Sequence, residues 1–177
     1  IIRDLPQPFP PKHDLPTFRE WVTRAFRLTR TEWDPEERMP RSLIDRAERA
    51  FDEVERNGGQ HLLLHGDLHH ENILLDDTLG WTVIDPKGVI GPHPLEVGRF
   101  LQNQLPDAEP IDRRVAIVRD RLEIFSRTLG CSQRLLASAG LVDCVLGRCW
   151  SLEDESTGEN WERGIELGRA YCEMLDQ

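Results

Sequence analysis

Three oxygen-bearing side chains in the middle of the sequence, Asp67, Asn72 and Asp85, stand next to short apolar runs. An apolar run of three or four residues that stops at Gly, Asp or Pro is typical of a short strand rather than a helix. We therefore expect the three polar residues to lie at strand ends and in loops, close together in space. Carboxylate and amide oxygens gathered in this way can hold a hard cation and a hydroxyl group. The runs are Leu62–Leu64, Ile73–Leu75 and Trp81–Ile84.

The segments around these runs indicate how they are positioned. The link Asp76–Gly80, DDTLG, predicts a hairpin loop between the second and third runs, because Asp and Gly are common turn residues. Apolar residues at helical spacing predict helices elsewhere, with charged or proline-bounded loops at 31–39 and 105–110. The chain is thus expected to be α+β and mainly helical, with a small antiparallel hairpin. The expected helices cover 17–30, 41–56, 94–101, 111–129, 132–152 and 158–175.

The spacing of these residues resembles that of two loops found in kinases. The letters HGD, four further residues and Asn72 reproduce the catalytic loop HRDxxxxN, and IDP at 84–86 stands where kinases have DFG. With Gly in place of Arg, HGDLHHEN and IDPKG resemble the aminoglycoside phosphotransferase family, and within it the streptomycin and hydroxyurea phosphotransferases. The resemblance is specific from about Leu62 onward and loose before it. Its further segments are GP at 91–92, EV at 96–97 and WSLED at 150–154.

The resemblance implies a fold and an activity. The fold would be a protein-kinase-like C-terminal lobe, in which the β-hairpin carries the catalytic and metal loops. The activity would be ATP-dependent transfer of the γ-phosphoryl group to a hydroxyl of a small molecule, with Mg²⁺ as the metal. Antibiotic resistance is the role that the family implies. We expect the protein to be cytoplasmic.

Asp67 is the candidate catalytic base, because a carboxylate in hydrogen-bond reach orients an acceptor hydroxyl and takes its proton. The alternative is a turn aspartate that caps loop amides. Asn72 and Asp85 are the candidate magnesium ligands, since Mg²⁺ takes few protein oxygens and fills its shell from phosphates and water. Asn72 could otherwise be a turn residue. Asp85 could be a strand end, because a residue before proline favours extended geometry.

Four further residues lie beside this trio. His65 follows an apolar run, so we expect it to hold the loop together through hydrogen bonds rather than to contact substrate. His69 and His70 are candidates for orienting Asp67 or approaching the phosphates. Lys87 is a candidate for offsetting phosphate charge, and pairing with Asp85 is its alternative role.

The formal net charge of −10 argues against nucleic acid as a partner and suits a cationic small molecule. Acidic residues concentrate after Trp150, where carboxylates could bind ammonium or guanidinium groups of the acceptor. A solvated helix end is the alternative. The candidate acceptor-binding residues are Trp150, Glu153, Asp154, Glu155 and Glu159.

Other classes of protein and site find little support in the sequence. No apolar run approaches the roughly 20 residues that span a bilayer, so no membrane is expected. The N-terminus does not resemble a secretory signal. The four cysteines lack C-x-x-C spacing and are expected to be free thiols.

The part of a kinase that covers the nucleotide is not recognisable here. A kinase N-lobe has a Gly-rich loop and a strand lysine, whereas the lysines of this chain are Lys12 and Lys87. We therefore expect 1–16, which is rich in proline, to be the remnant of an interlobe linker and 17–177 to be the C-terminal lobe. A non-catalytic kinase-like module is an alternative function. A two-metal phosphoesterase, suggested by the letters GDLH, is another.

Overall fold

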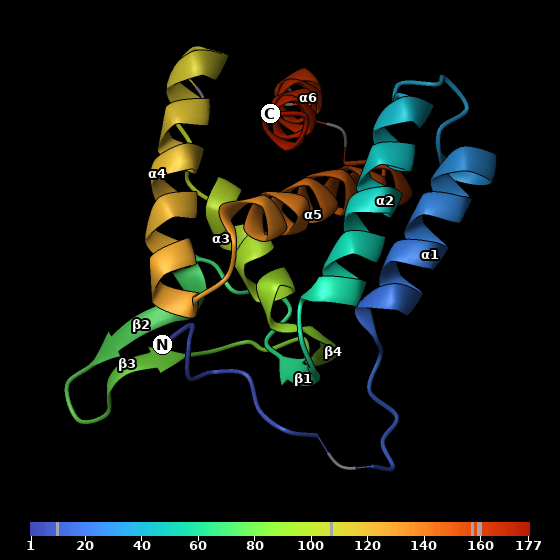
Figure 1. Cartoon of the computed structure of the whole chain (residues 1–177). Coiled ribbons are helices and arrows are strands. Elements are labelled where there is room, and N and C mark those ends of the chain that lie inside the picture. The colour runs from blue at the N-terminus through green and yellow to red at the C-terminus, as the bar shows by residue number, and fades with distance from the viewer. Residues whose placement is uncertain (10, 107, 157, 159–160) are drawn as a thin grey trace.

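The computed structural model describes residues 1–9, 11–106, 108–156, 158 and 161–177. It is mainly helical, with two small antiparallel sheets at one end of the helices (Figure 1). The α-helices are α1 Phe18–Leu28, α2 Arg41–Asn57, α3 Gly98–Gln102, α4 Ile111–Leu129, α5 Gln133–Glu153 and α6 Trp161–Leu175. The strands are β1 His61–Leu64, β2 Ile73–Asp76, β3 Gly80–Val83 and β4 Val89–Pro92. Shorter helical turns are η1 Thr29–Trp33, η2 His70–Asn72 and η3 His93–Val97.

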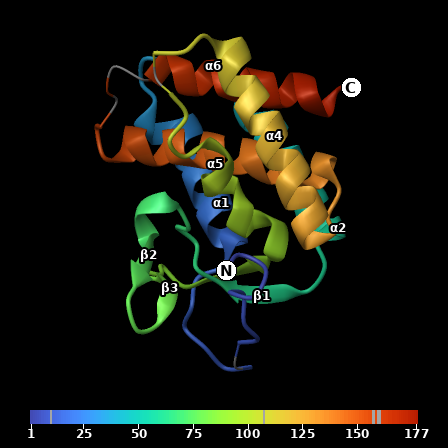
Figure 2. The same ribbon diagram turned by 90° about the vertical axis from the view of Figure 1, so that its left-hand side faces the viewer.

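The central helix α5 organises the core. It contacts α1, α2, α3, α4 and α6, and it crosses the middle of the molecule in Figure 1. Close approach of α6 depends on Gly140, because a Cβ there would lie 2.7 Å from the ring of the fully buried Tyr171. In Figure 2, α5 and α6 run side by side above the strands. The apolar residues of α5 are therefore enclosed by neighbouring helices.

Helix α5 is also long and apolar enough to cross a membrane, contrary to the expectation that no segment would qualify. Of its most apolar window, 72% is buried inside the structure. Burial in the core accounts for this composition, because a helix that is covered on all sides needs no polar face.

The predicted hairpin is confirmed. β2 pairs antiparallel with β3, from Ile73 opposite Val83 to Asp76 opposite Gly80. The carboxylate of Asp76 accepts hydrogen bonds from the backbone N–H groups of Thr78 and Leu79, 2.8 Å each, which closes the turn. The hairpin extends away from the helices in Figure 2.

A second ladder was not predicted. β1 pairs antiparallel with β4, Leu64 opposite Val89, and this pairing returns the chain to the loop that follows β1. The N-terminal segment adds to the ladder, because Gln7 and Leu63 exchange two backbone hydrogen bonds of 2.7 and 3.0 Å. Within the expected interlobe segment, Gln7 thus lies beside β1.

The described helix boundaries follow the sequence closely, with two differences. The helix expected from 158 is described from Trp161, because 159–160 lie outside the described residues. Thr17 and Glu20 form a reciprocal capping box that starts α1. The expected loop at 31–39 begins late, because the helix continues to Trp33 as a π-helix while Arg30 pairs with Asp45 at 2.6 Å. The helix expected from Pro94 begins instead as a 3₁₀ turn, η3, and becomes α-helical only at Gly98.

Candidate active site

The loop after β1 is shaped by a glycine. Gly66 has φ +78°, and a Cβ there would lie 2.6 Å from Cγ1 of Val89 on β4. A side chain would therefore meet both backbone strain and a clash. Glycine at this position lets the loop turn tightly against β4 and present Asp67, whose side chain is 22% exposed, at the end of the sheet.

His65 joins the two candidate loops. Its ring is buried, with Nε2 2.8 Å from the carbonyl oxygen of Ile84, while the backbone N–H of Asp67 donates to Nδ1 at 3.3 Å. Both ring nitrogens are engaged if the neutral ring carries its proton on Nε2. The ring therefore fixes the loop of Asp67 to the strand end that precedes Asp85.

A buried carboxylate, Glu96 on η3, holds the same loop from the other side. The backbone N–H groups of His65 and Gly66 donate to its two oxygens at 2.6 and 3.1 Å. Burial raises the pKa of Glu96, against the two backbone hydrogen bonds, which lower it. Only 2% of the residue is exposed, so the contact is a structural clamp on the loop that carries Asp67.

The structure brings Asn72 to Asp67. Nδ2 of the buried Asn72 donates to the backbone carbonyl oxygen of Asp67 at 2.9 Å. Because this bond engages the amide nitrogen, Oδ1 is the atom of Asn72 that is left to act as a metal ligand. The backbone carbonyl of Asn72 also accepts from the N–H of Ile84 at 3.0 Å, which ties it to the strand leading to Asp85.

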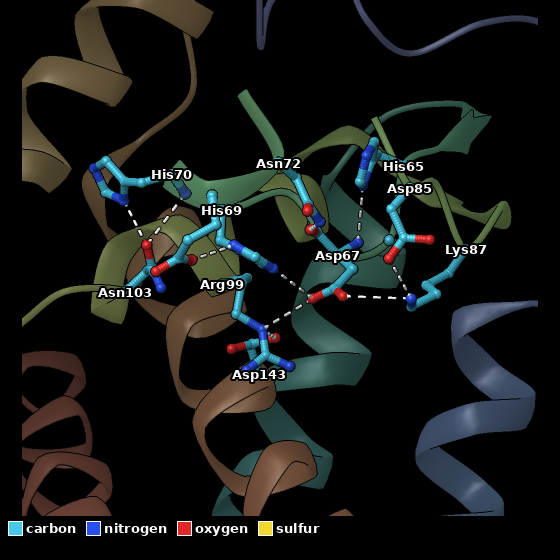
Figure 3. Close-up of polar contacts among 12 residues, drawn as sticks. His65, Asp67, His69, His70, Asn72, Asp85, Lys87, Arg99, Asn103 and Asp143 are labelled. Atoms are coloured by element: carbon cyan, nitrogen blue, oxygen red, sulfur yellow. Dashed lines mark hydrogen bonds and ion pairs between the residues drawn. The ribbon is translucent and has the colours of Figure 1, made fainter. Parts of the chain in front are cut away.

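Asp85 is not extended, as a simple strand end before proline would be, but has φ +56°. This left-handed geometry is strained for a residue before proline, and such strain occurs often at functional sites. Nζ of Lys87 lies 2.9 Å from Asp85 and 3.8 Å from Asp67, between the two carboxylates (Figure 3). The hydrogen bond from Lys87 lowers the pKa of Asp85, and Asp85 in turn raises the pKa of Lys87.

The carboxylate of Asp67 faces three basic groups at distances longer than hydrogen bonds. Besides Lys87, Nε of Arg99 lies 3.6 Å away and Nε2 of His69 lies 3.9 Å away. The pKa of Arg99 is raised, chiefly by the carboxylate of Asp143 and further by Asp67, against the effect of burial. These long contacts leave the oxygens of Asp67 able to accept a further hydrogen bond.

The two histidines after Asp67 occupy different places (Figure 3). His69 lies between Asp67 and Glu71, whose Oε2 is 2.6 Å from Nδ1. His70 points away, with Nδ1 2.5 Å from Oδ1 of Asn103 and its ring stacked against Phe100 at 4.1 Å between centroids. Of the pair, His69 is therefore the one beside the candidate base.

The acidic segment after Trp150 has other contacts. Glu153 forms an ion pair with Arg24, with Oε1 2.5 Å from Nη2, and the ring of Trp150 packs edge-on against Trp21. Asp154 and Glu155 are exposed at the end of α5, and Glu159 lies outside the described residues. Trp21 also lies close to the loop of Asp67, because a Cβ on Gly66 would lie 3.3 Å from its ring.

Among the described residues, no group of three or more His, Cys, Asp and Glu side chains is arranged to hold a metal ion. The candidate pair of one amide and one carboxylate, Asn72 and Asp85, falls outside such a grouping. It matches the preference of Mg²⁺ for a small number of protein oxygens. A cluster of the kind that a two-metal phosphoesterase requires is not found in this described part.

Comparison with known families identifies a family for this chain. The model of the aminoglycoside/hydroxyurea antibiotic resistance kinases matches residues 1–155. The chain belongs to this kinase family. No solved structure matches it significantly.

Individual relatives share about a third or less of their residues with this chain over the aligned segments. Streptomycin 3''-kinase of Klebsiella pneumoniae is 32% identical over 115 residues, which are 64% of this chain and 38% of the relative. Streptomycin 6-kinase of Streptomyces griseus is 27% identical over 95 residues, 54% of this chain and 31% of the relative. Its counterpart of Streptomyces glaucescens is 28% identical over 94 residues, with 53% and 31% covered. The matches thus span roughly a third of each relative's length.

Three residues at the site of this kinase-family chain are absent from the sequence-based candidates: Glu96, Arg99 and Asp143. Glu96 and Arg99 are one helical turn apart, and a sequence signal for Glu96 exists, because an acid within the apolar string PLEV indicates a buried carboxylate. Asp143 carries a similar signal, since it interrupts the apolar run LVDCVL of α5.

Proposed function

We propose that this chain is the C-terminal, catalytic part of an ATP-dependent phosphotransferase that acts on a hydroxyl of a small molecule. Residues 17–177 would form a kinase-like C-lobe, with 1–16 as the interlobe linker, in a cytoplasmic enzyme. The observation that carries the proposal is the convergence of Asp67, Asn72 and Asp85, in a chain whose family consists of kinases. The convergence joins segments that are held together by hydrogen bonds through His65.

Asp67 is proposed to orient the acceptor hydroxyl and to accept its proton. Its carboxylate is partly exposed and lies beside basic groups at distances longer than a hydrogen bond. Its backbone is held by hydrogen bonds with His65 and Asn72. General-base help of this kind typically contributes about 10²–10⁴-fold to the rate. His69, 3.9 Å away, is proposed to position this carboxylate.

Oδ1 of Asn72 and the carboxylate of Asp85 are proposed to hold Mg²⁺. The donor set fits this ion, because one amide and one carboxylate leave positions for phosphate oxygens and water. When bound, Mg²⁺ would neutralise charge on the nucleotide phosphates. Lys87 sits between both carboxylates and is proposed to exchange its contact with Asp85 for one with the phosphates.

Small-molecule acceptors are proposed from the relatives, whose names state that they phosphorylate streptomycin. The family description adds hydroxyurea as a second compound class. Binding of a cationic acceptor by the acidic segment after Trp150 receives less support, because Glu153 is already neutralised by Arg24. Asp154 and Glu155 remain available at the surface.

The test is transfer of label from γ-labelled ATP, by the protein that contains this chain, to a panel that includes streptomycin and hydroxyurea. Transfer should require Mg²⁺, and Asp85→Ala should abolish it. The matched control is Asp77→Ala, an exposed aspartate in the hairpin turn, which should keep wild-type activity. Metal-independent transfer, or full activity of Asp85→Ala, would contradict the proposal.

A further inference from the structure

A polar pocket of about 390 Å³ lies next to the candidate active site, between η2, α3, α4, α5 and α6. Four arginines and two acids are among its lining residues, so these side chains carry a formal charge of +2 in a chain whose net charge is −10. A concentration of positive charge in an acidic protein indicates a site for an anion. The charged lining residues are Arg99, Arg114, Arg148, Arg163, Glu71 and Asp143.

Arg114 is the most informative of these residues. It lies in the first turn of α4, where the helix dipole disfavours a cation, and only 6% of it is exposed. Among the described residues, its buried Nε finds no hydrogen-bond partner, and neither does the buried Nη1 of Arg163. A guanidinium removed from water without a counter-charge is unfavourable, so a ligand anion would supply what the described residues do not.

The two acids of the pocket do not provide that counter-charge. Asp143 is engaged by Nε of Arg99 at 3.8 Å and by the side-chain amide of Gln102. Glu71 lies against His69 at the rim. Within the described part of the chain, no salt bridge reaches Arg114 or Arg163 from any carboxylate.

Arg99 connects the pocket with the chemistry. It belongs to the pocket lining, and its Nε is also 3.6 Å from Oδ1 of Asp67 (Figure 3). A molecule bound in the pocket would therefore approach Oδ1 of Asp67, whereas Lys87 lies beside Oδ2. A guanidinium group binds carboxylate or phosphate oxygens in pairs, which gives an anionic ligand a defined orientation.

We propose that this arginine pocket binds an oxyanion group, carboxylate or phosphate, of the hydroxyl-bearing acceptor. The part of the proposal that concerns the acceptor rests on the proposed phosphotransferase function, whereas anion binding itself does not. It differs from the expectation of a cationic acceptor that the acidic composition suggests. Arg114 and Arg163 bind the anion, and Arg99 holds it beside Asp67.

The test is calorimetric titration of the 177-residue chain, without ATP and at constant ionic strength. The probes are gluconate, a polyhydroxylated carboxylate, its neutral counterpart glucose, and inorganic phosphate. Gluconate should bind more tightly than phosphate, and glucose should not bind. Arg114→Gln should weaken gluconate binding by about tenfold or more, because a charge-assisted hydrogen bond is lost.

Arg113→Gln is the matched control, since Arg113 is the exposed neighbour of Arg114 and pairs with Glu109. It should bind gluconate as the wild type does. Arg163→Gln is an independent variant that should weaken gluconate binding in the same way. It tests the proposal if Arg114→Gln does not fold. No anion binding, equal loss in Arg113→Gln, or binding of phosphate alone (an adventitious ion only) would each overturn the proposal. Because ATP is absent from the titration, a failed phosphotransfer assay would not change the measured anion binding. Failure of the anion to bind would likewise leave the phosphotransferase proposal standing.

Discussion

The clamp that Glu96 places on the loop of Asp67 gives a prediction whose magnitude follows from the structure. Its two oxygens accept from two backbone N–H groups, of His65 and Gly66. At a pH above the raised pKa of Glu96 the wild type offers two acceptor oxygens, whereas the amide of Glu96→Gln offers one, so one N–H group would face the NH₂ group without a partner. An unsatisfied donor in a buried place costs about 1–3 kcal/mol. For a chain of this size, that cost lowers the melting temperature by roughly 2–12 °C.

Thermal unfolding followed by circular dichroism measures this difference. The matched control is Glu123→Gln, an exposed residue of α4 that pairs with Arg127 and should melt close to the wild type. Faster amide hydrogen exchange at His65 and Gly66 in Glu96→Gln would locate the loss in the loop. If Glu96→Gln melts with the wild type, the carboxylate does not hold the loop and the reasoning fails.

Three more predictions concern pH, packing and the metal-site pair. The folded protein keeps the proton of Glu96 at pH values where the unfolded chain has lost it. The free energy of unfolding of the wild type should therefore fall relative to that of Glu96→Gln as pH rises through the raised pKa. Urea unfolding at several pH values measures this, and parallel profiles of the two proteins would contradict it. Gly140→Ala should destabilise the chain by about 1–3 kcal/mol through overlap with Tyr171, and unchanged urea unfolding would refute that packing. Lys87→Met should raise the pKa of Asp85 toward its ordinary value in a carboxyl NMR titration, and an unmoved titration would deny the pairing.

The elements that could be predicted from sequence are those with local signals. The β2–β3 hairpin follows from two short apolar runs and a turn whose aspartate bonds its own loop. Thr17 and Glu20, three residues apart, mark the start of α1. By contrast, β4 has the sequence VIGP, whose Gly and Pro disfavour a strand, and its partner β1 lies far away along the chain. Its pairing depends on tertiary packing rather than on local preference.

The residues of the candidate site likewise fall into those with a local sequence signal and those placed by tertiary packing. Asp67, Asn72 and Asp85 are found by spacing, because kinase loops keep a fixed distance between these residues. Glu96 acts on a backbone group 31 residues earlier, and Arg99 meets Asp143 only because α3 packs on α5. Contacts of this range depend on the folded arrangement. The left-handed backbone of Asp85 likewise contradicts the local rule for a residue before proline.

The proposed role of Asp67 is tested most directly by the turnover of Asp67→Asn in the protein that contains this chain. The measurement is single-turnover transfer from γ-labelled ATP at saturating Mg²⁺, together with the nucleotide dissociation constant. We predict that turnover falls by about 10²–10⁴-fold while nucleotide affinity stays close to wild type. Near wild-type turnover of Asp67→Asn would contradict it, because the residue would then be structural rather than catalytic.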